Sequence, residues 1–279
     1  MDGFSTTLPS KSFSWQRARA RLTHSVPTLL IALAVLVTWE VGIRVLGVEQ
    51  FILPRPSAIG RALFDEMQRS VLAGENSLLF AAAQTTTRAA LSGFVIGSGA
   101  AFVSALLVAR WTLANEALMP FAIAANSVPI IAFAPIMNNW FGLTNLASKA
   151  AIVAVVVYFP VMINTMRGLT EIEPLHHDLL HAYAAKPWQT LVKLRIPNAL
   201  PYTFGALRVA STLSVISAVV GEYFGGSRDT LGVYITQAAA GFDFVKVWEA
   251  ILVASLIGLS FFGAIHLAEQ WVIPWHKRG

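Results

Sequence analysis

Residues 171–197 read EIEPLHHDLLHAYAAKPWQTLVKLRIP, a polar and charged stretch that interrupts two long apolar runs. The runs on either side, at about 148–168 and 199–221, are each long enough to cross a bilayer as a helix. A connection of this length, with charges and a helical pattern, is more than a turn between two membrane spans. We expect it to lie in water and to present a docking surface to another protein.

The composition agrees with a membrane protein. Of the 279 residues 56% are hydrophobic and only 13% are charged, and the mean hydropathy is +0.62. A soluble domain carries roughly 25% charged residues, so most of this chain is expected to face lipid. The absence of cysteine excludes disulfides and thiolate metal sites.

Spans of this length predict an all-α, polytopic membrane protein, because backbone groups in lipid must be satisfied within the segment. A transmembrane barrel does not fit, since its strands would be short and alternate in polarity. We expect about six transmembrane helices, at 26–47, 80–109, 118–137, 148–168, 199–221 and 246–270.

The arrangement of Lys and Arg predicts the orientation. Most of those that flank the spans fall on the side of the N-terminus and of 171–197, which is expected to be cytoplasmic. Both termini are then cytoplasmic. The predicted parts are a cytoplasmic segment 1–25, a transmembrane domain 26–273 and a cytoplasmic tail 274–279. On the outer side, the amphipathic stretch from Ser57 to Val71 predicts a helix lying on the bilayer surface.

A helical pattern runs through the polar connection from Pro174 to Gln189. Pro174 suits the first turn of a helix, and Leu175 and Leu179 share one face. Pro187 is expected to end or kink this helix. Such a helix can insert into a groove of another protein. It can equally pack back on its own bundle, and the pattern alone leaves both readings open.

The connection resembles the signature loop of the permeases of binding-protein-dependent ABC importers: Glu-Ala-Ala, three residues, Gly, nine residues, Ile-x-Leu-Pro. Asp stands here for Glu, Leu for both Ala, and Ala for Gly, which indicates that a helical conformation is tolerated at the Gly position. The resemblance implies that the residues at the matching positions couple the protein to an ATPase. They are Asp178, Leu179, Leu180, Ala184, Leu194, Ile196 and Pro197.

Further stretches resemble the same family in the same order along most of the chain. They include Phe51–Ser57, Thr85–Phe94, Val128–Pro135, Trp140–Gly142 and Val220–Phe224. The most similar branch is the nitrate, sulfonate, taurine and thiamine-pyrimidine type, with the fold of a type I importer permease.

The resemblance implies partners. Two permease copies, here a homodimer, would form the pathway. Two cytoplasmic ATPases would bind the loop helices, and an extracytoplasmic solute-binding protein would deliver the solute. The chain lacks any Gly-Lys dipeptide, which a phosphate-binding loop requires, so ATP hydrolysis belongs to the partner. We expect no enzymatic activity, no cofactor and no nucleic-acid partner. The loop histidines His176, His177 and His181 have no carboxylate pair arranged around them and do not predict a metal site.

Polar residues within or at the ends of the apolar spans are candidates for the substrate pathway. Serines in a span are more often contacts between helices, and a carboxylate at the end of a span can simply be solvated. As a set, however, they predict a lining for a polar, weakly charged solute. The candidates are Asn126, Ser127, Ser214, Ser217 and Glu222.

Two other patterns indicate structure. Glu40 and Arg44, four residues apart in the first span, predict an internal ion pair. Gly93 and Gly97 predict a face on which two helices pack closely.

The predicted function is therefore a permease subunit for a small organic solute. The spans contain no cluster of Arg or Lys that could bind a strong anion. This favours a neutral N-heterocycle as the solute, such as a thiamine pyrimidine precursor or a riboflavin-like compound. Import of sulfonate, taurine or nitrate is the alternative. A self-sufficient secondary transporter would show internal repeats and a carboxylate near the midplane, and an intramembrane enzyme would show a catalytic cluster at that depth. The sequence shows neither.

Overall fold

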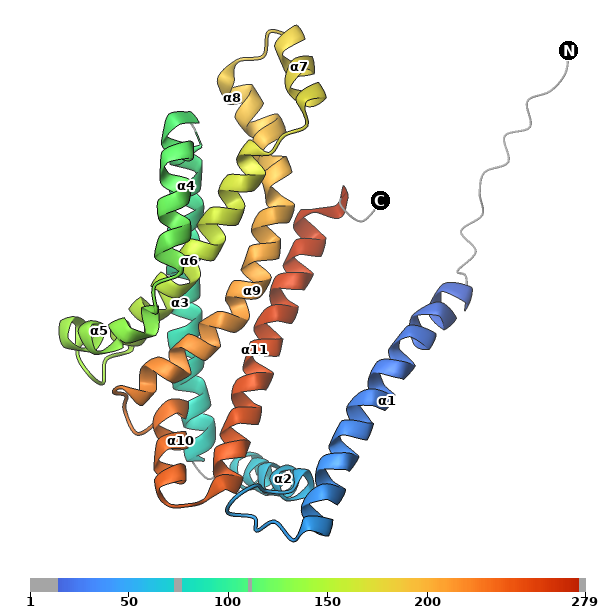
Figure 1. The fold of residues 1–279 in the computed structure, drawn as a ribbon, viewed down its shortest axis with the longest axis vertical. Helices are drawn as coiled ribbons and strands as arrows, with labels where there is room; N and C mark the ends of the chain where they lie inside the picture. The colour runs from blue at the N-terminus through green and yellow to red at the C-terminus, as the bar shows by residue number, and fades with distance from the viewer. Residues whose placement is uncertain (1–14, 73–76, 110–111, 276–279) are drawn as a thin grey trace, which may run out of the picture.

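The computed structural model describes residues 15–72, 77–109 and 112–275, and every regular element in these ranges is helical (Figure 1). The elements are α1 Trp15–Leu46, α2 Pro56–Leu72, α3 Leu78–Val108, α4 Thr112–Asn126, the 3-10 helix η1 Ile130–Phe133, α5 Ala134–Phe141, α6 Leu146–Thr170, α7 Pro174–Ala182, α8 Pro187–Thr190, the π-helix η2 Leu191–Arg195, α9 Ile196–Tyr223, α10 Leu231–Ala240 and α11 Phe244–Val272.

Five helices of the described residues are long and apolar enough to cross a membrane. They are α3, α6 and α11, residues Val26–Leu46 of α1, and the run Pro187–Tyr223 that contains α9. The bounds of α3, α6, α9, α11 and the run Val26–Leu46 confirm five of the six predicted spans to within a few residues. The core of the bundle lies where α3, α6 and α9 pack on one another, and α11 packs on α9 (Figure 1).

The predicted span at 118–137 is wrong as a single helix. The structure divides this stretch among α4, η1 and α5. At 1.5 Å per residue, the 15 residues of α4 extend over only about 22 Å, less than the roughly 30 Å of a hydrocarbon core. Pro129 disfavours a helical conformation at Val128 and has no N–H to donate, which favours the end of α4 at Asn126.

Glycines allow α3 and α6 to approach closely, as the sequence predicted. Both Gly93 and Gly97 are buried against α6. A Cβ atom added to Gly93 would lie 2.5 Å from the carbonyl oxygen of Ala150, and one added to Gly97 would lie 2.8 Å from Cα of Ala154. The backbones are thus too close for any side chain at either position.

The amphipathic stretch on the outer side forms α2, which crosses the end of the bundle beside α1 (Figure 1). Glu40 of α1 accepts hydrogen bonds from Arg44 Nη2 at 2.6 Å, which confirms the predicted pair, and from the backbone N–H of Ser57 at 3.0 Å. That N–H belongs to the first turn of α2, where it has no partner within the helix. One carboxylate thereby joins α1 to the start of α2.

The chain brings three features to one end of the bundle. The first residues of α1, the tip formed by α7 and α8, and the last residues of α11 all point toward the same end, while α2 and α10 lie at the other (Figure 1). Residues 1–14 and 276–279, which hold most of the predicted N-terminal segment and tail, lie outside the described residues. The end that carries α7 is called the loop end below, and the end that carries α2 and α10 is called the far end.

Candidate functional site

The polar connection projects beyond the bundle instead of packing back on it. Figure 1 shows α7 and α8 extending past the loop end of α6 and α9. On α7 and just after it, Leu175, Leu179 and Tyr183 are 69%, 53% and 74% exposed. These residues recur every four positions, so they form one apolar stripe along the helix. An exposed stripe of this kind is what a helix that docks in a groove presents.

A tight turn ends α7 earlier than the sequence predicted. The expected helix from Pro174 to Gln189 stops at Ala182, and α8 begins only at Pro187. Ala184 has φ +48°, in the left-handed region, so the expectation of a helical Ala184 is wrong. The N–H of Ala185 donates to the carbonyl of Leu180 at 3.0 Å, which is the hydrogen bond of a helix end closed by a left-handed residue. This explains why glycine stands at this position in the signature, because a Cβ atom is strained there.

Replacing Ala184 with glycine is therefore expected to stabilise the turn by about 1 kcal/mol. Hydrogen exchange of the amides at 179–185 in the full-length protein should slow by about fivefold. The matched control is Ala182→Gly, which places the same change inside α7 and should speed exchange. Faster exchange in Ala184→Gly would contradict the strained turn.

The base of the connection is attached to three helices. Arg195 Nη1 donates to the carbonyl of Ala109, which caps α3, at 3.0 Å. Asn198 Nδ2 donates to the carbonyls of Gly168 and Glu171 at the end of α6, at 2.8 and 3.0 Å. Both donors lie at the start of α9, so a movement of this base would reach α3, α6 and α9 together.

A π-helical turn separates α8 from α9. The N–H of Ile196 donates to the carbonyl of Leu191, five residues back. Pro197 follows directly, and because it has no N–H it cannot supply the next bond. Irregular turns of this type are frequent at functional sites.

At the far end, a buried carboxylate joins three helices. Glu222, 1% exposed, lies near the end of α9. Its Oε2 accepts hydrogen bonds from the N–H of Gly232 at 2.8 Å and from Thr86 Oγ1 at 3.1 Å, and Thr86 Oγ1 accepts one from the N–H of Leu231 at 3.0 Å. The first N–H groups of α10 are thus satisfied by side chains of α9 and α3.

A second buried group fixes α5 to α6. Lys149 is 3% exposed, and its ammonium donates to Asn138 Oδ1 and to the carbonyl of Leu143, both at 2.6 Å. Asn138 in turn donates to the carbonyl of Phe224 at 3.2 Å. All three hydrogens of the ammonium find acceptors, because Ser148 Oγ lies 3.0 Å away.

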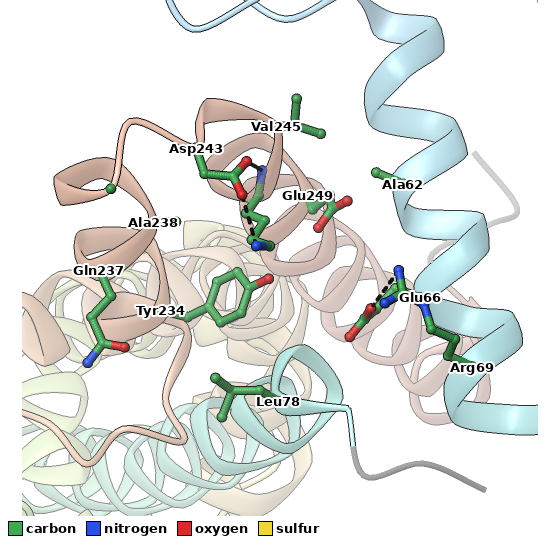
Figure 2. Close-up of a pocket in the computed structure, with 12 residues that line it drawn as sticks. Ala62, Glu66, Arg69, Leu78, Tyr234, Gln237, Ala238, Asp243, Val245 and Glu249 are labelled. Atoms are coloured by element: carbon green, nitrogen blue, oxygen red, sulfur yellow. Dashed lines mark hydrogen bonds and ion pairs between the residues drawn. The ribbon is translucent and has the colours of Figure 1, made fainter. Parts of the chain in front are cut away.

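A polar cavity of about 700 Å³ opens at the far end between α2, the start of α3, α10 and the start of α11 (Figure 2). Two ion pairs lie in its wall, Lys246 with Asp243 at 2.9 Å and Arg69 with Glu66 at 3.6 Å. Burial raises the pKa of Asp243, but the hydrogen bonds and charge of Lys246 lower it more, so the net shift is downward. Asp243 is therefore ionised at neutral pH.

Comparison with known proteins identifies the family. Residues 93–274 match the model of the binding-protein-dependent transport system inner membrane component. This chain belongs to that family. It is the permease subunit of a binding-protein-dependent ABC importer, and such permeases are transport proteins of the inner membrane and not enzymes.

Curated relatives of this permease include transporters for several solutes. The formylaminopyrimidine transport permease protein of Halalkalibacterium halodurans is 32% identical over 90% of this chain and 96% of the relative. The riboflavin transport system permease protein of Chloroflexus aurantiacus is 30% identical, over 90% of this chain and 89% of the relative. The taurine transport system permease protein of Escherichia coli is 23% identical over 96% of both chains.

In this permease the seven signature residues fall into two groups. Asp178, Leu179 and Leu180 lie on α7, with Ala184 in the turn that ends it. The other three lie at the base of the connection, in η2 and the first turn of α9: Leu194, Ile196 and Pro197. The first group is at the exposed tip, while the second is half-buried beside the core, where Ile196 packs on it.

The structure does not bring the five predicted pathway residues together. Ser214 and Ser217 are 0% and 3% exposed inside the bundle, and Ser214 Oγ donates to the carbonyl of Ser211 in its own helix. Glu222 is enclosed by the contacts described above. Asn126, the last residue of α4, and Ser127, which follows it, are exposed. Their assignment to a pathway thus stays a prediction.

A groove that sequence reasoning missed lies between α9, α10 and α11. It has a volume of about 550 Å³ and a mainly apolar wall. Its hydroxyl groups come from Thr212, Tyr223 and Ser255, and among the described lining residues there is no Lys or Arg. Three consecutive helices form it, and its shape depends on how they pack, so only the hydroxyl-rich face of the fifth span could have suggested it.

Proposed function

We propose that this permease forms the pathway for a small, largely uncharged N-heterocycle, such as a thiamine pyrimidine precursor or a riboflavin-like compound. The observation that carries the proposal is the groove between α9, α10 and α11. Its apolar wall suits a flat ring, the hydroxyl of Tyr223 can donate to a ring nitrogen or carbonyl, and the hydroxyl oxygens of Thr212 and Ser255, which donate within their own helices, can accept from a ring N–H. A sulfonate would be expected to need Arg or Lys in such a wall.

Similarity supports the same class of solute. Two relatives that are at least 30% identical are named for formylaminopyrimidine and riboflavin transport, while the taurine permease is 23% identical. Import of sulfonate, taurine or nitrate is the alternative. It is favoured by the putative aliphatic sulfonates permease of Bacillus subtilis, which is 27% identical.

We further propose that α7 is the element that couples the permease to its ATPase. The exposed stripe of Leu175, Leu179 and Tyr183 would enter a groove of the ATPase, and Asp178 would pair with a basic group there. ATP-driven closure would then move the base of the connection and, through Arg195 and Asn198, the helices attached to it. In this proposal the seven signature residues form the coupling site.

The orientation and the assembly belong to the same proposal. The loop end would be cytoplasmic, with both termini on that side, and 26–273 would form the transmembrane domain. The far end would face the solute-binding protein. A second copy of this chain would complete the pathway, with Asn126, Ser127, Ser214, Ser217 and Glu222 as its polar lining in the transporting states.

The test of the solute is uptake by proteoliposomes that hold this permease, its ATPase and its solute-binding protein. We expect ATP-dependent accumulation of a formylaminopyrimidine or riboflavin and little accumulation of taurine or an alkanesulfonate. A Thr212→Val variant, which removes one hydroxyl of the groove, is expected to reduce uptake by about fivefold, as for one lost hydrogen bond. Preferential uptake of taurine or sulfonate would contradict the proposed solute and support the alternative.

A further inference from the structure

The cavity at the far end contains a buried carboxylate, that of Glu249, which takes no part in the hydrogen bonds and ion pairs of its wall. Glu249 lines this cavity from α11 and is only 5% exposed (Figure 2). It forms no hydrogen bond and no ion pair with any residue in the described ranges. A buried carboxylate that lacks a partner is costly, so its presence in the wall of a cavity points to a ligand that supplies one.

The charges around the cavity leave Glu249 unmatched. The wall holds three carboxylates, those of Glu66, Asp243 and Glu249, and two basic groups. Each basic group is already paired, Arg69 with Glu66 and Lys246 with Asp243, as the dashed lines in Figure 2 show. The carboxyl group of Glu249 is therefore left without a basic partner in the wall.

The size of the cavity and the residues of its wall indicate what kind of ligand could supply that partner. About 700 Å³ is within the range of sites for small organic molecules. Tyr234 contributes an aromatic ring, and Leu78 and Ala238 contribute apolar surface (Figure 2). Among the described residues no group of three His, Asp or Glu side chains is placed to hold a metal ion. An organic cation fits these features better than a metal does.

We propose that the cavity between α2, α3, α10 and α11 binds a small organic cation, with an amidinium, guanidinium or ammonium group that donates to Glu249. The flat part of the ligand lies against Tyr234 and the apolar wall. The site is separate from the groove between α9, α10 and α11. Its occupancy does not depend on which solute the importer carries, so the two proposals can fail independently.

Benzamidinium is a suitable probe, and neutral benzamide is its control because the two have nearly the same shape. Binding is measured on the full-length permease in lipid nanodiscs by isothermal titration and by the shift of the denaturation midpoint. We expect benzamidinium to bind and to raise the midpoint, and benzamide to have little effect. Glu249→Gln is expected to weaken the binding of benzamidinium by about tenfold to a hundredfold.

Two further variants make the test specific. Asp65→Asn removes another carboxylate of α2 that does not line the cavity, and it should leave binding unchanged. Ala62→Leu narrows the cavity from α2 while keeping Glu249, and it should weaken binding even if Glu249→Gln alters folding. Equal binding to the wild type and Glu249→Gln would overturn the proposal, as would an equal loss in Asp65→Asn. Binding of a triarginine peptide without binding of benzamidinium would assign the cavity to a partner protein and overturn it too.

Discussion

Gly97→Val is expected to prevent this permease from folding into a stable bundle. The first carbon of the new side chain would meet the carbonyl oxygen of Ala154 and lie 2.8 Å from its Cα atom. Both atoms belong to the backbone of α6, so no rotation of a side chain can relieve the contact. Overpacking of a core commonly costs about 1–3 kcal/mol, and a clash with backbone in the main helix contact should reach or exceed that range. Size-exclusion profiles and thermal denaturation of the purified protein measure the loss.

Gly99→Val is the matched control for this prediction. Gly99 lies two residues further along α3 and is exposed, and a Cβ atom there meets nothing within 4 Å. Valine is also slightly better than glycine in a helix interior, so this variant should be folded and at least as stable as the wild type. If the two variants behave alike, the close approach of α3 and α6 is not what stabilises the bundle.

Asp178→Lys is expected to reduce ATP-dependent uptake by at least about tenfold, the effect of roughly 1.4 kcal/mol at a contact with a partner. Asp178 is exposed on α7 and forms no ion pair with any residue that the structure describes. The change should therefore leave insertion and folding intact while it reverses the charge that is proposed to meet the ATPase. Uptake by proteoliposomes and copurification of the ATPase measure the effect.

Glu173→Lys is the control for coupling, because it reverses a charge in the same connection just before α7. Glu173 is 64% exposed and lies outside the signature positions. This variant should keep most of the uptake.

A second change, Ala184→Val, adds a β-branched residue at the strained left-handed position and should add to the loss in Asp178→Lys. If uptake and ATPase assembly survive both changes together, α7 is not the coupling element.

Structural features that depend on a pattern within a single helix were predicted well. The spans now seen as α3, α6, α9 and α11 agree with their apolar lengths, since each is determined by local composition and the thickness of the bilayer. The Glu40–Arg44 pair and the packing of Gly93 and Gly97 also follow from spacing on one helix. The prediction of one span at 118–137 was wrong because average hydropathy does not take account of Pro129, which interrupts the helix.

The candidate sites likewise have some features that local sequence indicated and others that depend on how the helices pack. The signature spacing singled out the polar connection proposed to couple to the ATPase. The left-handed turn at Ala184 is set by how the end of α7 closes, whereas residue type alone suggested a helix. Glu222 was singled out as a polar group at the end of a span, whereas its burial depends on Gly232 in the next helix and on Thr86, which is far away in the chain. Lys149 and Glu249 lie near span ends and carried no local signal of burial.

Sequence patterns alone are enough to recognise an all-helical membrane permease with a polar connection between two of its spans, because hydropathy, charge placement and the spacing of the signature are local properties. Which polar groups have hydrogen-bond partners became visible only in the packed helices. Lys149 finds three acceptors and Glu222 finds donors from two other helices, while Glu249 faces a cavity without a partner among the described residues. Thr86 reaches Glu222 only because helices distant in sequence pack, and Lys149 reaches Asn138 and Leu143 only because the connection before α6 folds back on it. The free energy of a buried charge depends on such partners.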